Sequence, residues 1–100
     1  MAVKILIKRH FKEGTIAEAF ALLLKFRHNA MYQRGYISGE TLSNHYDPRK
    51  IVVISTWQTI EDWIKWQESD EREANESQFE SMLEEPTQFE IYDIGMKPEK

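Results

Sequence analysis

The sequence predicts an α+β fold, in which a ferredoxin-like βαββαβ chain forms one antiparallel sheet with helices on one face. Three observations lead to this prediction. Four segments have the composition and patterning of strands, the regions between them place apolar residues at helical spacing, and only a short turn separates the middle two strands. With 100 residues, the chain is expected to form a single domain over residues 1–96 and a short tail over residues 97–100.

The first strand is expected over residues 3–10, whose interleaved lysines are typical of a sheet edge. A helix is expected from residue 16 to about Gln33. Thr15 and Glu18 form a capping-box pattern at its start, and Gly35 stands where a helix-ending glycine is expected. The apolar residues at helical spacing between these ends are Ile16, Ala19, Phe20, Leu23, Phe26 and Ala30.

The second and third strands are expected over residues 35–46 and 50–57, joined as a hairpin. In the turn between them, the side chain of Asp47 can accept a hydrogen bond from the backbone ahead of it. Pro48 presets its own backbone angle for a turn.

A helix broken in two should follow the hairpin. Thr59 is expected to cap a short helix over residues 60–67, and Ser69 a second helical segment over residues 69–83. Acidic residues directly after Ser69 suit the positive end of a helix dipole. The last strand is expected over residues 87–95.

The third strand is largely apolar on both faces, although helices of such a fold cover only one face. One face carries Ile51, Val53, Ser55 and Trp57, and the other carries Val52, Ile54 and Thr56. The first strand repeats this feature, since Leu6 lies opposite the face of its other apolar residues. A second copy of so small a chain is the simplest cover for this face. We therefore expect a homodimer with the two sheets packed face to face.

The distribution of charge excludes nucleic acid as an expected partner. Residues 1–50 hold nine Lys/Arg and four Asp/Glu, whereas residues 68–100 hold three and eleven. The basic residues form no run, and the acidic region would repel a polyanion. The first twelve residues have neither the pattern of a signal peptide nor that of a membrane span, so no membrane association is expected. The chain has no cysteine, which fits the reducing cytoplasm.

Three tryptophans lie close together, at Trp57, Trp63 and Trp66. Projected on a helix, Trp63 falls on the apolar stripe that includes Ile60, and it is expected in the core. Trp57, at the end of a strand, is expected to pack there too. Trp66 lies on the flank of the stripe, where a tryptophan is either half exposed or borders a cavity.

Two polar side chains interrupt apolar helix faces. Arg27 lies near the centre of the stripe of the first helix, where a guanidinium must reach solvent, pair with a carboxylate or face a polar cavity. Asn75, one turn before Phe79, extends the apolar face of the later helix. It can serve as a hydrogen-bonding group in a pocket, or as a capping or surface residue.

The three histidines, His10, His28 and His45, stand on separate elements without metal-ligand spacing, so no metal site is expected. His10 and His28 are candidates for a general base at neutral pH, although no motif places either of them. The chain contains neither a nucleophile elbow nor a glycine-rich phosphate loop, which argues against a hydrolase or a nucleotide site.

Three stretches resemble the antibiotic biosynthesis monooxygenase family: GYISGETL at residues 35–42, DPRKIVVISTWQTIEDWIKW at 47–66 and EEPTQFEIYDIG at 84–95. The resemblance extends over about residues 3–95. It implies a dimeric α+β barrel, made of two ferredoxin-like units whose sheets pack together. The family includes cofactor-independent enzymes that oxidise phenols or anthrones, quinol oxidases and haem-degrading enzymes.

The resemblance implies a small cofactor-independent monooxygenase that acts on an aromatic phenol, anthrone or quinol in a pocket between helices and sheet. Trp66 would wall this pocket, and Arg27 or Asn75 would stabilise the phenolate. Of the site residues of the haem-degrading branch, only the tryptophan matches, at Trp66. The positions of its asparagine and histidine carry Ile7 and Glu76, so haem degradation is disfavoured and no cofactor is expected.

Two alternatives to catalysis stay open. The protein can be a binding module that sequesters a small apolar molecule and turns nothing over. It can also be a purely structural homodimer, in which Trp66 packs against its own neighbours.

Overall fold

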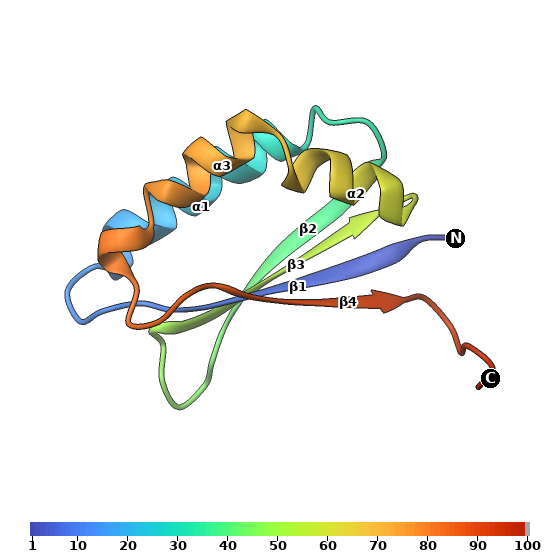
Figure 1. Ribbon diagram of the computed structural model, residues 1–100. Coiled ribbons are helices and arrows are strands. Elements are labelled where there is room, and N and C mark those ends of the chain that lie inside the picture. Colours follow the sequence, from blue (N-terminus) through green and yellow to red (C-terminus); the bar gives the residue numbers. More distant parts are fainter. Residues whose placement is uncertain (100) are drawn as a thin grey trace.

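The computed structural model, which describes residues 1–99, has the α+β architecture expected from the sequence (Figure 1). The four strands form one antiparallel sheet in the order β2-β3-β1-β4, and all the helices lie over the same face of it. The elements are β1 (Val3–His10), α1 (Ile16–Ala30), β2 (Tyr36–Ser43), β3 (Lys50–Trp57), α2 (Ile60–Gln67), α3 (Asp70–Ser77), the 3₁₀ turn η1 (Glu80–Met82) and β4 (Gln88–Asp93).

The second helical region is broken in two, as predicted, and each part has the expected cap. Thr59 Oγ1 accepts a hydrogen bond from the backbone N–H of Asp62 at 3.1 Å, and Ser69 Oγ accepts one from Arg72 at 3.2 Å. The expected capping box of Thr15 does not form. The backbone of Thr15 is already helical, and its hydroxyl donates to the carbonyl of Lys12 at 2.7 Å.

The expectation that β1 is an edge strand is wrong, because β1 lies between β3 and β4. Its lysines face the side of the sheet that has no helices. There Lys4 Nζ donates to Thr56 Oγ1 at 3.0 Å, and Lys8 Nζ pairs with Glu90 at 2.9 Å. A central strand tolerates lysine when only one of its faces is covered.

The helix-covered face of the sheet carries the core, in two neighbouring clusters. The first cluster holds all three tryptophans, in agreement with the core positions expected for Trp57 and Trp63. The rings of these two pack edge to face at 5.8 Å between centroids. The second cluster consists of Phe11, Ala19, Leu23, Ile51, Phe79 and Met82.

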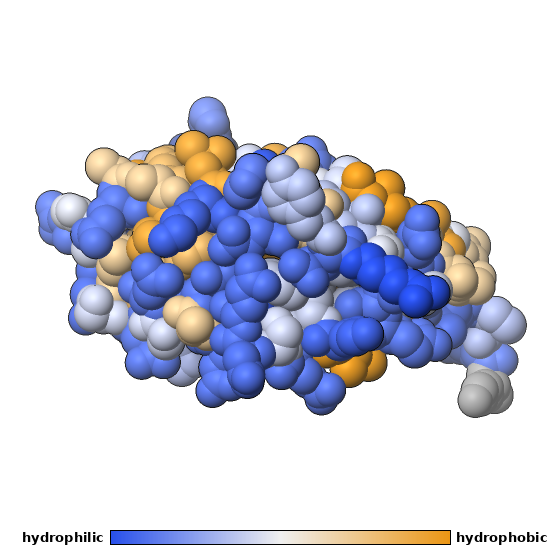
Figure 2. All heavy atoms as spheres, turned by 90° about the horizontal axis from the view of Figure 1, so that it is seen from above, coloured by the Kyte–Doolittle hydropathy of each residue, from blue (hydrophilic) through white to orange (hydrophobic). Residues whose placement is uncertain are grey.

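The opposite face of the sheet is bare (Figure 1). Leu6 pairs with Ile54, and Leu42 with Val52, so these apolar side chains project together from this face. Three of them are half-buried by their neighbours, while Leu42 remains exposed. The helix side, by contrast, presents a mostly hydrophilic surface with apolar patches near its margins (Figure 2).

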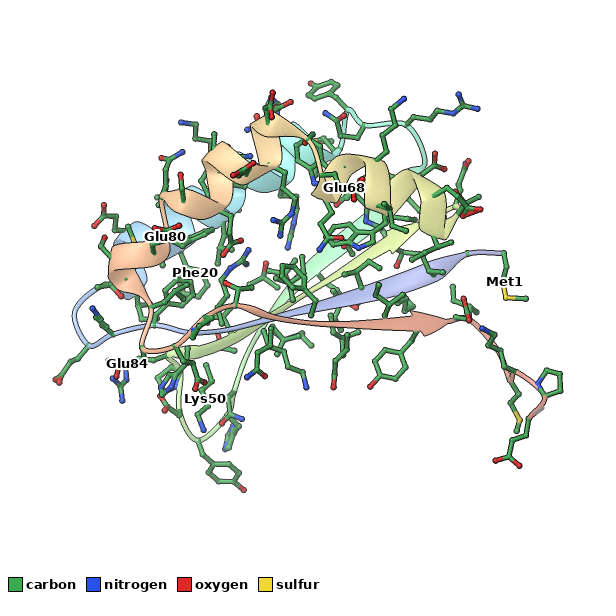
Figure 3. The ribbon with its side chains drawn as sticks, in the orientation of Figure 1. Met1, Phe20, Lys50, Glu68, Glu80 and Glu84 are labelled. Carbon is green, nitrogen blue, oxygen red and sulfur yellow. The ribbon has the colours of Figure 1, made fainter. Side chains whose placement is uncertain are left out.

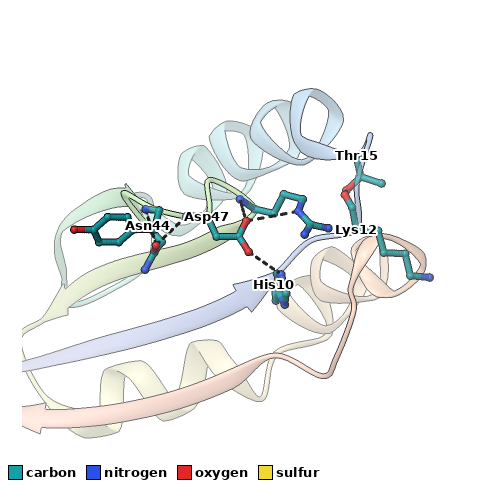
Figure 4. A network of polar contacts seen from close by, with 7 residues as sticks. His10, Lys12, Thr15, Asn44 and Asp47 are labelled. Carbon is teal, nitrogen blue, oxygen red and sulfur yellow. Dashed lines mark hydrogen bonds and ion pairs between the residues drawn. The ribbon is translucent and has the colours of Figure 1, made fainter.

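The turn between β2 and β3 is held by side-chain acceptors, as the sequence predicts (Figure 4). Asp47 Oδ1 accepts from the backbone N–H of Arg49 at 3.1 Å, and Asn44 Oδ1 accepts from two backbone N–H groups. The hydrogen bond from Arg49 is the main cause that lowers the pKa of Asp47. His10 Nε2 lies 3.4 Å from the other oxygen of Asp47.

Candidate functional site

A cavity of about 80 Å³ lies between the helix layer and the sheet. Its apolar walls include Leu23, Phe26, Val53, Trp57, Trp63 and Trp66. Its polar walls include Arg9, Arg27, Ser55, Arg72, Asn75 and Glu76. Figure 3 shows nitrogen-bearing side chains that reach into this layer between helices and sheet.

The cavity is smaller than one that holds a free aromatic ring, since a dry apolar cavity of about 150 Å³ binds benzene. Several of its lining residues on α1 and β2 are only half-buried, including Phe26, Arg27 and Tyr36. The cavity is therefore nearest to solvent on this side, and these side chains are the ones that can yield to a larger occupant.

An irregularity in β2 shapes this half-buried wall. The pairing of β2 with β3 shifts register between Tyr36 and Ser38, as in a β-bulge. The shift brings Tyr36 to the same face as Gly39 and Thr41, which simple alternation would not do. The hydroxyl of Tyr36 then occupies the space that a side chain at Gly39 would fill.

Three of the residues proposed from the sequence line this cavity together: Arg27, Trp66 and Asn75. Trp66 is buried, with 6% of its surface exposed, and borders the cavity rather than solvent. Arg27 is half-buried and donates through Nη2 to Thr41 Oγ1, which ties α1 to β2. Asn75 is buried on α3, where it lines the cavity.

The two histidines proposed as bases are placed elsewhere. His10 belongs to the β2–β3 turn network, at the far end of β1. His28 is exposed on α1, with its ring 5.1 Å from the ring of Tyr32. Neither lines the cavity, so the fold does not bring a histidine to Trp66.

Sequence reasoning missed a cluster of charges in the cavity wall. Arg9 Nη2 donates to Glu76 Oε1 at 2.6 Å, and Arg72 Nη2 lies 3.6 Å from the same oxygen. The hydroxyl of Thr87 donates to Glu76 Oε2 at 2.5 Å. A signal for Arg9 was available, because it occupies the next inward position of β1 after Ile7.

The ionisation of Glu76 follows from these neighbours. Burial disfavours its charged form, but Arg9, Thr87 and Arg72 together outweigh burial and hold the pKa of Glu76 below its ordinary value. For Arg72, burial is the main cause of a lowered pKa, although an arginine remains charged at any pH of interest. Three arginines against one glutamate leave the lining with a formal charge of +2.

Aromatic rings hold the two inner arginines in place. The guanidinium of Arg9 lies over the ring of Phe79, 4.6 Å from its centroid. That of Arg72 lies 5.5 Å from the centroid of Trp63 and 5.2 Å from that of Phe89. Such stacking, together with the ion pair, restricts both guanidinium planes.

A family model described as antibiotic biosynthesis monooxygenase matches residues 2–76, three quarters of the chain. The chain belongs to this family. The resemblance seen in the sequence is thereby confirmed. The matched region contains every residue that lines the cavity except Phe79. A search of curated proteins finds no match for this family member.

Solved structures share the fold of this antibiotic biosynthesis monooxygenase family member at low sequence identity. A conserved protein from Methanosarcina mazei is 16% identical, with a TM-score of 0.85 over 92% of this chain and 91% of that one. Rv0793 from Mycobacterium tuberculosis is 11% identical, with a TM-score of 0.84 over 99% and 100%. SnoaB, a cofactor-independent oxygenase from Streptomyces nogalater, is 10% identical, with a TM-score of 0.84 over 96% and 95%.

Across the residues that the structure describes, no group of three or more His, Cys, Asp or Glu side chains is arranged to hold a metal ion. Over the same residues, every helix is too short or too polar to span a bilayer.

Proposed function

We propose that this protein is a small cofactor-independent monooxygenase that oxidises an aromatic phenol or quinol in the cavity beside Trp66. The observation that carries the proposal is a cavity with three tryptophans and several polar donors in its wall, in a chain of the antibiotic biosynthesis monooxygenase family. An electron-rich phenolate can pass an electron to O₂ directly. The protein then has to exclude water, orient the ring and stabilise the oxyanion.

The reaction balances without an added reductant. With a phenol, one oxygen atom enters the ring as a quinone carbonyl. With a quinol, it enters as a ring hydroxyl, and the two oxygens already present become the quinone carbonyls. In both cases the other oxygen atom leaves as water with the two hydrogens that the substrate gives up. All the electrons therefore come from the phenol or quinol itself. In this scheme Trp66 orients the ring, and Arg27 or Asn75 stabilises the phenolate oxygen.

The size of the cavity favours a single-ring substrate over an anthrone. A space of about 80 Å³ takes three fused rings only if several wall residues move. A single ring requires much less, for example a shift of half-buried Phe26 or Tyr36.

A non-catalytic binding module is the second candidate. One observation favours it: neither His10 nor His28 lines the cavity, so no imidazole is at hand to take the phenol proton. As an enzyme, the protein would have to accept a phenol already ionised in solution. A structural homodimer without a site has less support, because Trp66 borders a cavity instead of packing only against its neighbours.

Haem degradation has little support from the residues present. The position expected for the haem-ligating histidine carries Glu76, and this carboxylate is held by Arg9, Arg72 and Thr87. The lining formed by the described residues includes no histidine. The set therefore does not fit a haem iron.

The proposal includes a homodimer that works in the cytoplasm. Leu6, Val52 and Ile54 form an apolar strip on the bare face of the sheet, whereas the helix side is mostly hydrophilic (Figure 2). A second copy would cover this strip and complete a dimeric α+β barrel. The absence of cysteine suits a reducing compartment.

Oxygen uptake tests the catalytic proposal. Purified, metal-free protein is mixed with hydroquinones, naphthols and anthrones, and uptake is compared with protein-free blanks. We expect uptake above the blank that falls in Trp66→Ala and persists in Tyr46→Ala, since Tyr46 is an exposed aromatic that does not line the cavity. Saturable quenching of tryptophan fluorescence without any uptake would instead favour the binding module.

A further inference from the structure

We propose that the cavity selects aromatic carboxylates: a single-ring acid, such as a hydroxybenzoate, whose carboxylate is held by Arg9, Asn75 and Trp63. This inference shares only its cavity with the proposed function and names the class of ligand that enters it. It rests on three features of the cavity wall, which are its unpartnered donors, its charge and its lack of a histidine base.

The first feature is a set of buried donors that lack acceptors. Within residues 1–99, four buried side-chain nitrogens have no hydrogen-bond partner. One of them, His10 Nε2, lies in the β2–β3 turn network, and the other three are Arg9 Nε, Trp63 Nε1 and Asn75 Nδ2. The three residues all line the cavity, and they are at most 8% exposed. Buried donors of this kind are costly unless something supplies lone pairs to them. The missing partner is therefore an acceptor, and an occupant rich in oxygen supplies it.

The second feature is the sign of the charge. The lining carries a formal charge of +2, because Glu76 neutralises only one of three arginines. The oxygens of Glu76 are already engaged by Arg9 and Thr87, so this carboxylate has little left for the unpartnered donors. An anionic occupant would balance the excess charge in a site where water screens poorly.

The third feature separates a carboxylate from a phenolate. No histidine lines the described part of the cavity, so the wall offers no imidazole to remove a phenol proton. A benzoic acid is already ionised at neutral pH, whereas most phenols are not. A carboxylate also offers two oxygens with about four lone-pair positions, which is enough for all three donors.

The wall combines fixed guanidinium groups with side chains that are only half-buried. Arg9 is stacked on Phe79 and Arg72 on Trp63, so the guanidinium groups are organised before a ligand arrives. The half-buried side chains, Phe26 and Tyr36, belong to α1 and β2. An acid would thus place its carboxylate at the fixed donors, and half-buried Phe26 or Tyr36 would move to admit its ring.

Benzoate and benzamide provide the decisive pair of probes, because they have the same ring and nearly the same size but differ in charge. Each is titrated into the wild-type protein at pH 7 and followed by tryptophan fluorescence and by calorimetry. We expect benzoate to bind at least about tenfold more tightly than benzamide, as for a hydrogen bond that gains a charge. Phenol and 4-hydroxybenzoate are titrated in parallel, and 4-hydroxybenzoate should follow benzoate.

Two variants test the residues proposed to hold the carboxylate. Asn75→Asp keeps the shape of the side chain and places a negative charge beside the carboxylate, so benzoate affinity should fall at least about tenfold while benzamide affinity changes little. Arg9→Lys keeps the charge and removes the planar donor Nε, and it should also weaken benzoate. Arg34→Met, at an exposed arginine, is the matched control. Thermal melts establish that each variant is folded.

Equal affinity for benzoate and benzamide would overturn the proposal, as would the absence of binding by any probe, which would mean that water alone serves the donors. Tighter binding of phenol than of benzoate would overturn the carboxylate in favour of a phenolate. These outcomes are separate from the fate of the proposed function. Benzoate binding without oxygen uptake supports the carboxylate ligand and contradicts the monooxygenase activity. Oxygen uptake with neutral phenols but without benzoate binding supports the activity and contradicts the carboxylate ligand.

Discussion

Arg9 on β1 and Glu76 on α3, 67 residues apart in the chain, meet in a partly buried ion pair of 2.6 Å in the wall of the cavity between helix layer and sheet. Arg9 is the more deeply buried partner, with 6% of its side chain exposed against 23% for Glu76. The pair therefore does two things. It fastens α3 to the sheet, and it orients a guanidinium whose Nε remains free for an occupant of the cavity.

Replacing Glu76 by glutamine should destabilise the protein at neutral pH, because it leaves the charge of Arg9 buried without a partner. Breaking a buried pair typically costs 3–5 kcal/mol, and the partial exposure of Glu76 places our expectation near the lower end, at about 3 kcal/mol. Urea unfolding at pH 7 measures the difference. A loss below about 1 kcal/mol would mean that the pair behaves as a surface pair.

The stability difference between wild type and Glu76→Gln should depend on pH. The pKa of Glu76 is lower in the folded protein than its ordinary value of 4.5, so its stabilising effect is fully present above that value. This contribution is lost as the pH falls through the lowered folded-state pKa. The gap in stability between wild type and Glu76→Gln should therefore narrow below about pH 4.5. A gap that stays constant from pH 7 to pH 3 would contradict this account.

Much of the fold was predictable because the signals for it are local. The bounds of β1 and β3 follow from runs of β-branched residues, and the break between α2 and α3 follows from a capping serine. The position of β1 in the sheet was not predictable in this way. Strand order depends on pairing across long stretches of chain, and lysine is typical of an edge and of a bare face alike.

The same distinction between local signals and long-range pairing applies to the candidate site. Arg27, Trp66 and Asn75 could be selected from the sequence because each is unexpected at its place on its own helix: Arg27 and Asn75 put polar groups on an apolar face, and Trp66 lies on the flank of one. The partnership of Arg9 with Glu76 could not, since it joins a strand to a helix late in the chain. Arg9 was recognisable as inward-facing by alternation, but nothing near it in the sequence identifies its counter-charge.

Trp66→Phe should keep the fold and impair the site. The substitution removes part of a buried side chain and enlarges the cavity, which costs less than the 3–5 kcal/mol typical of a tryptophan truncated to alanine. A looser wall orients a bound ring less well, and small misplacements lower rates by up to about a hundredfold. We expect an unchanged circular dichroism spectrum and a clear fall in oxygen uptake or ligand quenching. Oxygen uptake at the wild-type rate in a folded variant would contradict the role of Trp66 in orienting the ring.

Gly39→Ala should alter the cavity wall with little effect on the backbone. A methyl group at Gly39 would overlap the hydroxyl of Tyr36 and lie 3.3 Å from Arg27 Nε, so both side chains have to shift. Ligand affinity should change accordingly. Gly14→Ala is the matched control: Gly14 has a φ of +82° with nothing within 4 Å, so the substitution strains only the backbone, by about 1 kcal/mol. A change of ligand affinity in Gly14→Ala but not in Gly39→Ala would contradict this assignment.

Ile54→Lys should separate the proposed dimer into monomers. Ile54 lies opposite Leu6 at the centre of the bare sheet face, and a lysine there would bring two like charges together across a face-to-face interface. Sedimentation at several protein concentrations distinguishes the two states. Leu24→Lys is the control, because Leu24 is 69% exposed on α1, on the helix side of the molecule. The wild type and Leu24→Lys should sediment as dimers and Ile54→Lys as a monomer. A wild type that sediments as a monomer at every concentration would show that the bare face needs no second copy, because the half-burial of Leu6, Val52 and Ile54 by their own neighbours is then cover enough.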